Sequence, residues 1–97
     1  MPQFVILSNL TAKGLADLKG GPARYQAVVK GVEAAGGKVL SCHATMGAYD
    51  SVLVAEAPSD ELAALMSMST AAQGYVTTQT LRAFTPEEFA GLVSQLP

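Results

Sequence analysis

The stretch that decides the fold is residues 38–57, which reads KVLSCHATM (38–46), GAYD (47–50) and SVLVAEA (51–57). The first segment alternates apolar and polar side chains, which is typical of a strand with one face on a core. The last segment opens with an apolar run, which is typical of a central strand buried on both faces. Gly47 and Asp50 are residue types that favour turns. We therefore expect a β-hairpin, in which Gly47 supplies a positive φ and Asp50 accepts backbone N–H bonds of the turn.

Alternation along the first hairpin strand predicts which side chains face the helices. One set is expected to point towards the helices and the other set towards the opposite, more polar face. The first set is Leu40, Cys42, Ala44 and Met46, and the second is Val39, Ser41, His43 and Thr45.

The part of the chain before the hairpin predicts a strand followed by an interrupted helix. The run Phe4-Val5-Ile6-Leu7 is apolar on both alternating faces, so we expect a second central strand. Thr11 can cap the following helix. Gly20-Gly21 and then Pro22 break the helical pattern, which predicts two segments rather than one rod. Gly36-Gly37 supplies the left-handed stop.

The part after the hairpin predicts a helix, a strand and a last helix. Residues 58–61 open the first of these helices, whose expected buried stripe is Leu62, Leu65, Met66 and Ala72. Tyr75 to Phe84 is Thr-rich and predicts an edge strand. Residues 85–88 read TPEE, a capping box with proline at the first helical position. The apolar stripe of the last helix is Phe89, Leu92, Val93 and Leu96.

The order of elements predicts an α+β fold of the ferredoxin-like kind. Strands one and three are the central ones, so the βαββαβ order gives an antiparallel sheet of strand order 4-1-3-2, with an added C-terminal helix. Right-handed crossovers place both helices on one face of this sheet. The other face is then a bare apolar patch, which monomers rarely expose. We therefore expect residues 1–97 to form a single domain that pairs as a homodimer or larger homo-oligomer.

Composition narrows the possible partners. The 97 residues carry a net charge of −2 with only 14% charged residues, which argues against nucleic-acid binding. No apolar run reaches the ~20 residues that span a bilayer, so no membrane contact is expected. The start of the chain lacks the pattern of a signal peptide, which makes the cytoplasm the expected location. A single cysteine, Cys42, excludes an internal disulfide.

Five residues are candidates for binding a ligand. His43 and Tyr49 combine a donor and acceptor with an apolar ring near one strand pair, and Asp50 adds a carboxylate. Arg24 and Arg82 could each receive a carboxylate or phosphate. A structural reading competes for each of them: an interface histidine and ring, a turn cap and two surface ion pairs. One histidine makes a poor metal site, so we expect no metal and no cofactor, although it could still serve as an axial haem ligand.

The sequence resembles the small GYD-domain family. The name-giving motif corresponds to Gly47, Tyr49 and Asp50, and the segments 4–7, 37–39 and 80–84 also fit the family pattern. The resemblance spans almost the whole chain and implies the dimeric α+β barrel group of folds, but no established activity. More loosely, residues 42–50 and 74–76 are similar to the effector-binding domains of Lrp/AsnC regulators, whose helix-turn-helix this chain lacks.

Three functions remain open from the sequence. The first is an oligomeric module that binds or senses a small molecule, with no catalytic residues assigned. The second is a cofactor-poor or haem-handling enzyme of the α+β barrel type, for which fold analogy is the sole support. The third is a structural interaction subunit without a ligand.

Overall fold

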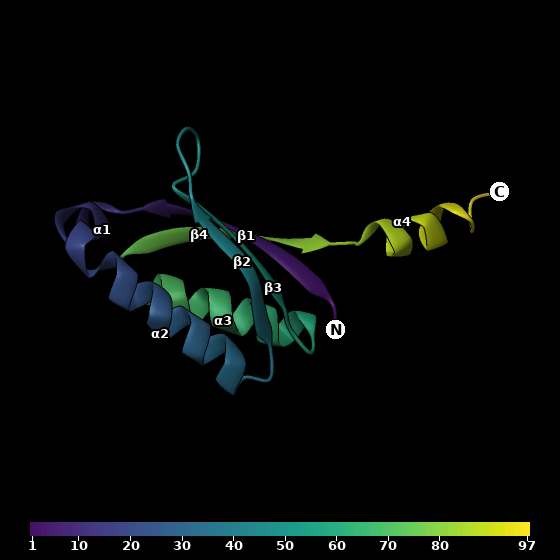
Figure 1. Ribbon diagram of the computed structural model, residues 1–97, viewed down its shortest axis with the longest axis horizontal. Coiled ribbons are helices and arrows are strands. Elements are labelled where there is room, and N and C mark those ends of the chain that lie inside the picture. Colours follow the sequence, from purple (N-terminus) through teal and green to yellow (C-terminus); the bar gives the residue numbers. More distant parts are fainter.

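A computed structural model describes all of residues 1–97, arranged as a four-stranded sheet with two long helices on one side (Figure 1). The elements in chain order are β1 (Gln3–Leu10), α1 (Ala12–Ala16), the short 3-10 helix η1 (Leu18–Gly20), α2 (Gly21–Ala34), β2 (Lys38–Ala44), β3 (Ser51–Glu56), α3 (Asp60–Ala72), β4 (Val76–Ala83) and α4 (Pro86–Val93).

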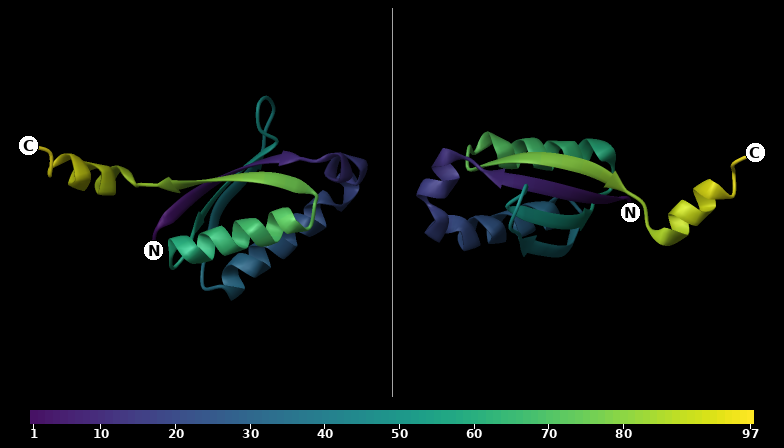
Figure 2. Two further views of the ribbon diagram at one scale, coloured as in Figure 1. Left: turned by 180° about the vertical axis from the view of Figure 1, so that it is seen from behind. Right: turned by 90° about the horizontal axis from the view of Figure 1, so that it is seen from above.

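The sheet has the predicted order, with β1 and β3 in the centre. Its strands run β2-β3-β1-β4, and every neighbouring pair is antiparallel. The helices α2 and α3 lie side by side against one face of it (Figure 2). The predicted ferredoxin-like fold is therefore confirmed, and the apolar runs at residues 4–7 and 52–55 lie in the two central strands.

The strand register separates the side chains of the two faces. Ile6 pairs with Leu53 on one side and Thr80 on the other, and these three share the face that the helices cover. The neighbouring set lies on the uncovered side, which we call the open face. Its residues are Gln3, Val5, Leu7, Asn9, Lys38, Ser41, His43, Val52, Val54, Glu56, Thr77, Gln79, Leu81 and Ala83.

A β-bulge corrects the predicted alternation of β2. The register shifts between Val39 and Ser41, and Val39 pairs with Ala55 on the helix-covered face instead of the opposite one. A bulge places two residues opposite one on the next strand, so the alternation restarts after it. Leu40, expected to face the helices, is 40% exposed at this irregularity.

The hairpin connection is longer than predicted. β2 ends at Ala44, and residues 45–50 form a loop that rises away from the helices (Figure 1). Met46 lies in this loop and is 98% exposed, so its predicted place against the helices is wrong. Gly47 has the expected positive φ, 101°.

The helix boundaries follow the predicted signals. The Thr11 hydroxyl accepts a hydrogen bond from the N–H of Gly14, and the chain breaks at η1 before α2 starts at Gly21. Gly36 ends α2 with a φ of 87°. None of the helices is both long and apolar enough to cross a membrane.

The predicted buried stripe of α3 is wrong in detail. Ala63 is its one fully buried residue, whereas Leu65 is 54% exposed and Ala72 is exposed. The small side chain of Ala63 lets the start of α3 approach Phe4 and Ala57 closely. That contact, rather than the helical periodicity alone, determines which side of α3 faces the sheet.

The core of the domain is small. Six of the 97 residues are fully buried, and among their side chains Phe4 is the one aromatic ring. Phe4, Ala57 and Ala63 form a compact cluster, with Ile6 and Met66 packed beside it. Much of the remaining space between the sheet and the helices is not filled by side chains.

The last helix, α4, projects away from the domain (Figure 2). Its capping box is formed as predicted: the Thr85 hydroxyl accepts from the N–H of Glu88, and the Glu88 carboxylate accepts from the N–H of Thr85. That backbone hydrogen bond lowers the pKa of Glu88. No residue of α4 is buried, and the longest extent of the molecule is 52 Å.

Candidate functional site

Asp50 ties the hairpin to the neighbouring central strand. Its Oδ2 accepts a hydrogen bond of 2.8 Å from the N–H of Leu10, and its own N–H donates to the carbonyl of Ser8 at 2.8 Å. β3 begins only at the next residue, so no β3 residue reaches Leu10. The carboxylate therefore takes the place that a strand carbonyl would have. The donor belongs to β1, which corrects the expectation that Asp50 caps its own turn.

His43 and Tyr49 both lie on the open side of the sheet. His43 is exposed on β2, directly across from Val52. The Tyr49 carbonyl accepts from the Thr45 hydroxyl at 2.6 Å, and the Tyr49 hydroxyl donates to Oε1 of Gln79 at 2.8 Å. Because Gln79 is on β4, the ring of Tyr49 bridges from the hairpin loop to the far edge of the open face.

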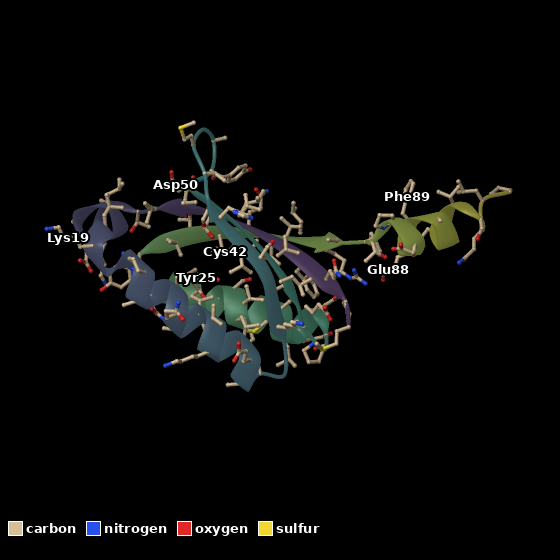
Figure 3. All side chains as sticks on the ribbon, viewed as in Figure 1. Lys19, Tyr25, Cys42, Asp50, Glu88 and Phe89 are labelled. Carbon is tan, nitrogen blue, oxygen red and sulfur yellow. The ribbon has the colours of Figure 1, made fainter.

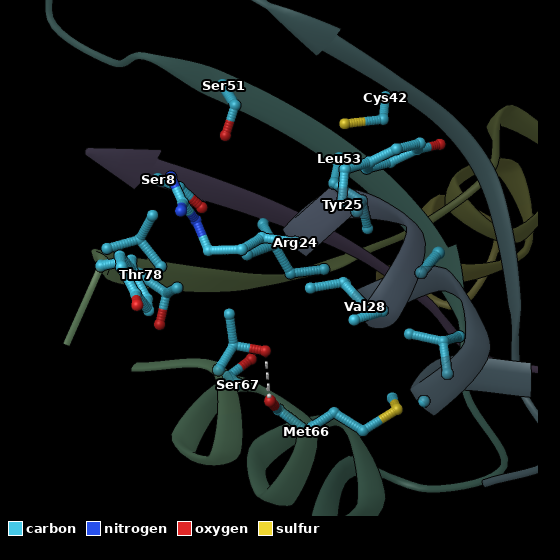
Figure 4. A pocket seen from close by; sticks show the side chains of 18 of the residues that line it. Ser8, Arg24, Tyr25, Val28, Cys42, Ser51, Leu53, Met66, Ser67 and Thr78 are labelled. Carbon is cyan, nitrogen blue, oxygen red and sulfur yellow. Dashed lines mark hydrogen bonds between the residues drawn. The ribbon is translucent and has the colours of Figure 1, made fainter. Parts of the chain in front are cut away.

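A cavity of about 750 Å³ occupies the space between the sheet and the two helices (Figure 4). We call it the interlayer cavity. Its apolar walls come from the sheet and from both long helices. They include Ile6 of β1, Leu53 of β3, Val28 of α2 and Met66 of α3. Polar side chains interrupt these walls, among them Ser8, Ser51, Ser67, Thr78 and Cys42.

Arg24, the fourth residue of α2, lines this cavity. Its Nη1 donates to Oδ2 of Asp17 at 2.8 Å, and its Nη2 donates to the Asp17 carbonyl at 2.7 Å. Its guanidinium also lies 4.2 Å from the centre of the Tyr75 ring, which Lys13 covers at 4.3 Å. The group is therefore held in one place, and Figure 4 shows it extending towards Ser8 on β1.

Arg82 lies at the other end of the domain. Its guanidinium is 4.6 Å from the centre of the Phe84 ring, and its Nε is 4.0 Å from Oδ1 of Asp60. It is not among the residues that line the interlayer cavity. The five candidates thus fall into three places: His43 and Tyr49 on the open side, Arg24 and Asp50 on the cavity wall, and Arg82 apart from both.

Several cavity residues were not singled out from the sequence. Ser8 interrupts an otherwise apolar central strand, and Ser67 lies on the face of α3 that turns to the sheet, where its Oγ is 2.6 Å from Oγ1 of Thr80. Ala27 and Gly31, which has no side chain, line the cavity from α2 and are both exposed. The sequence signal that could have indicated the cavity was the presence of polar or small residues at positions that face the core.

The site shows no arrangement for covalent or metal chemistry. No group of three His, Cys, Asp or Glu residues is close enough together to hold a metal ion. Cys42 faces the cavity near Tyr25 (Figure 3), and burial raises the pKa of its thiol. A protonated thiol is a weak nucleophile. The cavity therefore offers apolar walls and hydrogen-bonding groups that can contact a ligand.

Comparison with known proteins gives two matches. The model of the GYD domain matches residues 4–93. A protein of Thermus thermophilus named "Glutamine synthetase and cystathionine beta-lyase binding protein" is 37% identical over 84 residues, which cover 86% of this chain and 88% of that protein.

Replacement of Asp50 by alanine should destabilise the domain. It leaves the N–H of Leu10 without a partner, which costs on the order of 1–2 kcal/mol in the free energy of unfolding. Urea denaturation of Asp50→Ala measures this loss. Asp17→Ala is the matched control, because its ion pair with Arg24 is exposed and such pairs contribute about 0–1 kcal/mol. Equal losses for both variants would show that the bond to Leu10 is not important for stability.

The thiol of Cys42 should react slowly at neutral pH. Burial raises the pKa of Cys42 in the folded protein, so folding favours the protonated thiol. The contribution of this thiol to the free energy of unfolding is present at low pH and is lost as the pH rises through the folded pKa. The rate of alkylation by iodoacetamide should therefore rise at a higher pH in the native chain than in the chain unfolded in urea. Coinciding pH profiles would contradict the raised pKa.

Proposed function

The chain belongs to the GYD domain family, and from this premise we propose that it is a small protein-binding module that works as a homodimer. The name of the relative, a binding protein for two enzymes, supports a binding role. Two copies pair through their open faces, and each keeps its helix-covered side free.

The open face is the observation that carries this proposal. Its centre is formed by valine and leucine side chains of β1 and β3, and its charged residues, Lys38 and Glu56, lie opposite each other at one end of the face. These central positions are only partly buried in the single chain. A contiguous apolar patch of this kind is typical of an interaction surface. A second copy supplies the same apolar centre, and Lys38 and Glu56 lie at the end of the face, away from this centre.

The chain exposes more surface than a compact monomer would. The chain exposes 6268 Å², whereas a compact monomer of its mass exposes roughly 5,200 Å². The walls of the interlayer cavity and the projecting α4 contribute to this excess of about 1,000 Å². It is nevertheless comparable to the ~800 Å² that each partner buries in a standard interface. The radius of gyration, 14.6 Å, also exceeds the ~12.5 Å expected for one compact domain of this length.

The projecting helix α4 provides a second surface, for a different protein. Its apolar residues are Phe89, Leu92 and Val93, with Leu96 just beyond its end, and all four are 45% or more exposed. Their i, i+3, i+4, i+7 spacing is the one by which an amphipathic helix enters a groove of a partner. The relative is named for binding two enzymes, which makes an enzyme the kind of partner we propose for this helix.

Leu81→Glu should convert the dimer into a folded monomer. Leu81 is 44% exposed on the edge strand β4, so a carboxylate there is tolerated in one chain but is buried without a partner in the pair. Sedimentation velocity should show wild type near twice the 10.0 kDa mass of the chain and the variant near one chain mass. Met68→Glu on α3, 61% exposed, is the control that should stay dimeric. A monomeric wild-type protein would overturn the pairing.

Leu92→Asp should abolish binding to an enzyme partner. The probes are glutamine synthetase and cystathionine beta-lyase of the source organism, measured by biolayer interferometry. The variant should bind at least tenfold more weakly than wild type, because a charge enters the apolar contact. Gly91→Asp adds the same charge on the opposite side of α4, where nothing lies within 4 Å, and should bind normally. Wild type that binds neither enzyme would contradict this role of α4.

A further inference from the structure

The interlayer cavity lies where a domain of this fold would have its core. Its volume of about 750 Å³ falls within the ~300–1,000 Å³ of small-molecule pockets. The fully buried cluster of Phe4, Ala57 and Ala63 fills only one part of the space between the layers. Ile6, Val28 and Leu53 remain partly exposed although they point into that space.

Small residues keep the cavity open. On α2 the wall is made in part by Ala27 and Gly31, and a Cβ added at Gly31 would meet no atom within 4 Å. Glycine in the middle of a helix destabilises the helix relative to alanine. A larger residue would thus both favour the helix and fill the space. On α3 the corresponding positions are Ser67 and Thr70.

The cavity has a fixed cationic group on its wall. The two hydrogen bonds to Asp17 engage two of the five N–H donors of Arg24, and stacking on Tyr75 holds the guanidinium plane. The remaining donors are available to a ligand. Asp50 is the carboxylate on the cavity wall, and its Oδ2 already accepts from Leu10. Arg24 also lies in the first turn of α2, where the helix dipole favours an anion.

We propose that the interlayer cavity binds a small amphipathic molecule with an apolar body and one anionic group, which Arg24 receives. The apolar walls of the sheet, α2 and α3 contact the body, and the guanidinium forms charge-assisted hydrogen bonds with the anion. The site is on the opposite side of the sheet from the open face. It therefore does not depend on the proposed pairing or on the enzyme partner of α4.

Two fluorescent probes separate the contributions of the cavity and of Arg24. Anilinonaphthalenesulfonate has an apolar body and one anionic group, and phenylnaphthylamine has a similar body without the charge. Wild type should bind both, with higher affinity for the anionic probe. A wild-type protein that binds neither probe would overturn the proposal.

Gly31→Leu tests whether the probes occupy the cavity. The added side chain fills the space, so the affinity for both probes should fall at least tenfold while resistance to urea stays equal or increases. Lower affinity in a chain of undiminished stability cannot come from unfolding. Gly91→Leu adds the same side chain on α4, outside the cavity, and should bind like wild type. Unchanged binding by Gly31→Leu would place the probes elsewhere, such as on the open face, and contradict the site.

Arg24→Met tests the anionic contact. Methionine keeps an apolar stem but removes the charge, so the affinity for the anionic probe should fall about tenfold and that for the neutral probe should stay within twofold. Arg82→Met, at the other end of the domain, is the control that should change neither. Equal losses for both probes, or none, would show that Arg24 does not receive the anion. Sedimentation of each variant reports pairing separately, so failure of the cavity proposal and failure of the dimer are distinguishable.

Discussion

Both crossover helices lie on the same side of the sheet, and the rest of the structure depends on this constraint. The connections β1-α2-β2 and β3-α3-β4 each join parallel strands that have one strand between them, and right-handed crossovers then place α2 and α3 on one face. The central strands consequently have two different environments. One apolar face meets helices across a partly empty layer, and the other carries no helix and is crossed by the Tyr49 ring, which reaches Gln79. The proposed pairing surface and the proposed ligand cavity both follow from this one-sided arrangement.

Local patterns were sufficient for most of the fold. The apolar runs at residues 4–7 and 52–55 identified the central strands, and the caps at Thr11 and Thr85 marked the true helix starts. These signals depend on neighbouring residues, so they can be read without knowing the partner elements. The bulge beside Leu40 and the roll of α3 about Ala63 could not be read in this way, because both depend on contacts between segments distant in the sequence.

The candidate site was only partly predictable for the same reason. Alternation placed His43 on the open face correctly, because the bulge lies before it and the restarted pattern agrees with the original one. The contact of Asp50 with β1 was missed, since the donor lies 40 residues away in the sequence. The cavity was missed because its volume depends on the separation of the sheet and helices. Ser8 and Gly31 hint at it, but a polar or small residue alone does not distinguish a cavity from close packing.

The helix α4 has no buried residue, so the packing of the sheet and of the other helices does not depend on it. Substitutions along its apolar stripe therefore carry almost no folding penalty for the sheet. A segment of this kind can diverge rapidly among relatives, exchanging one binding specificity for another, while the ferredoxin-like scaffold stays unchanged.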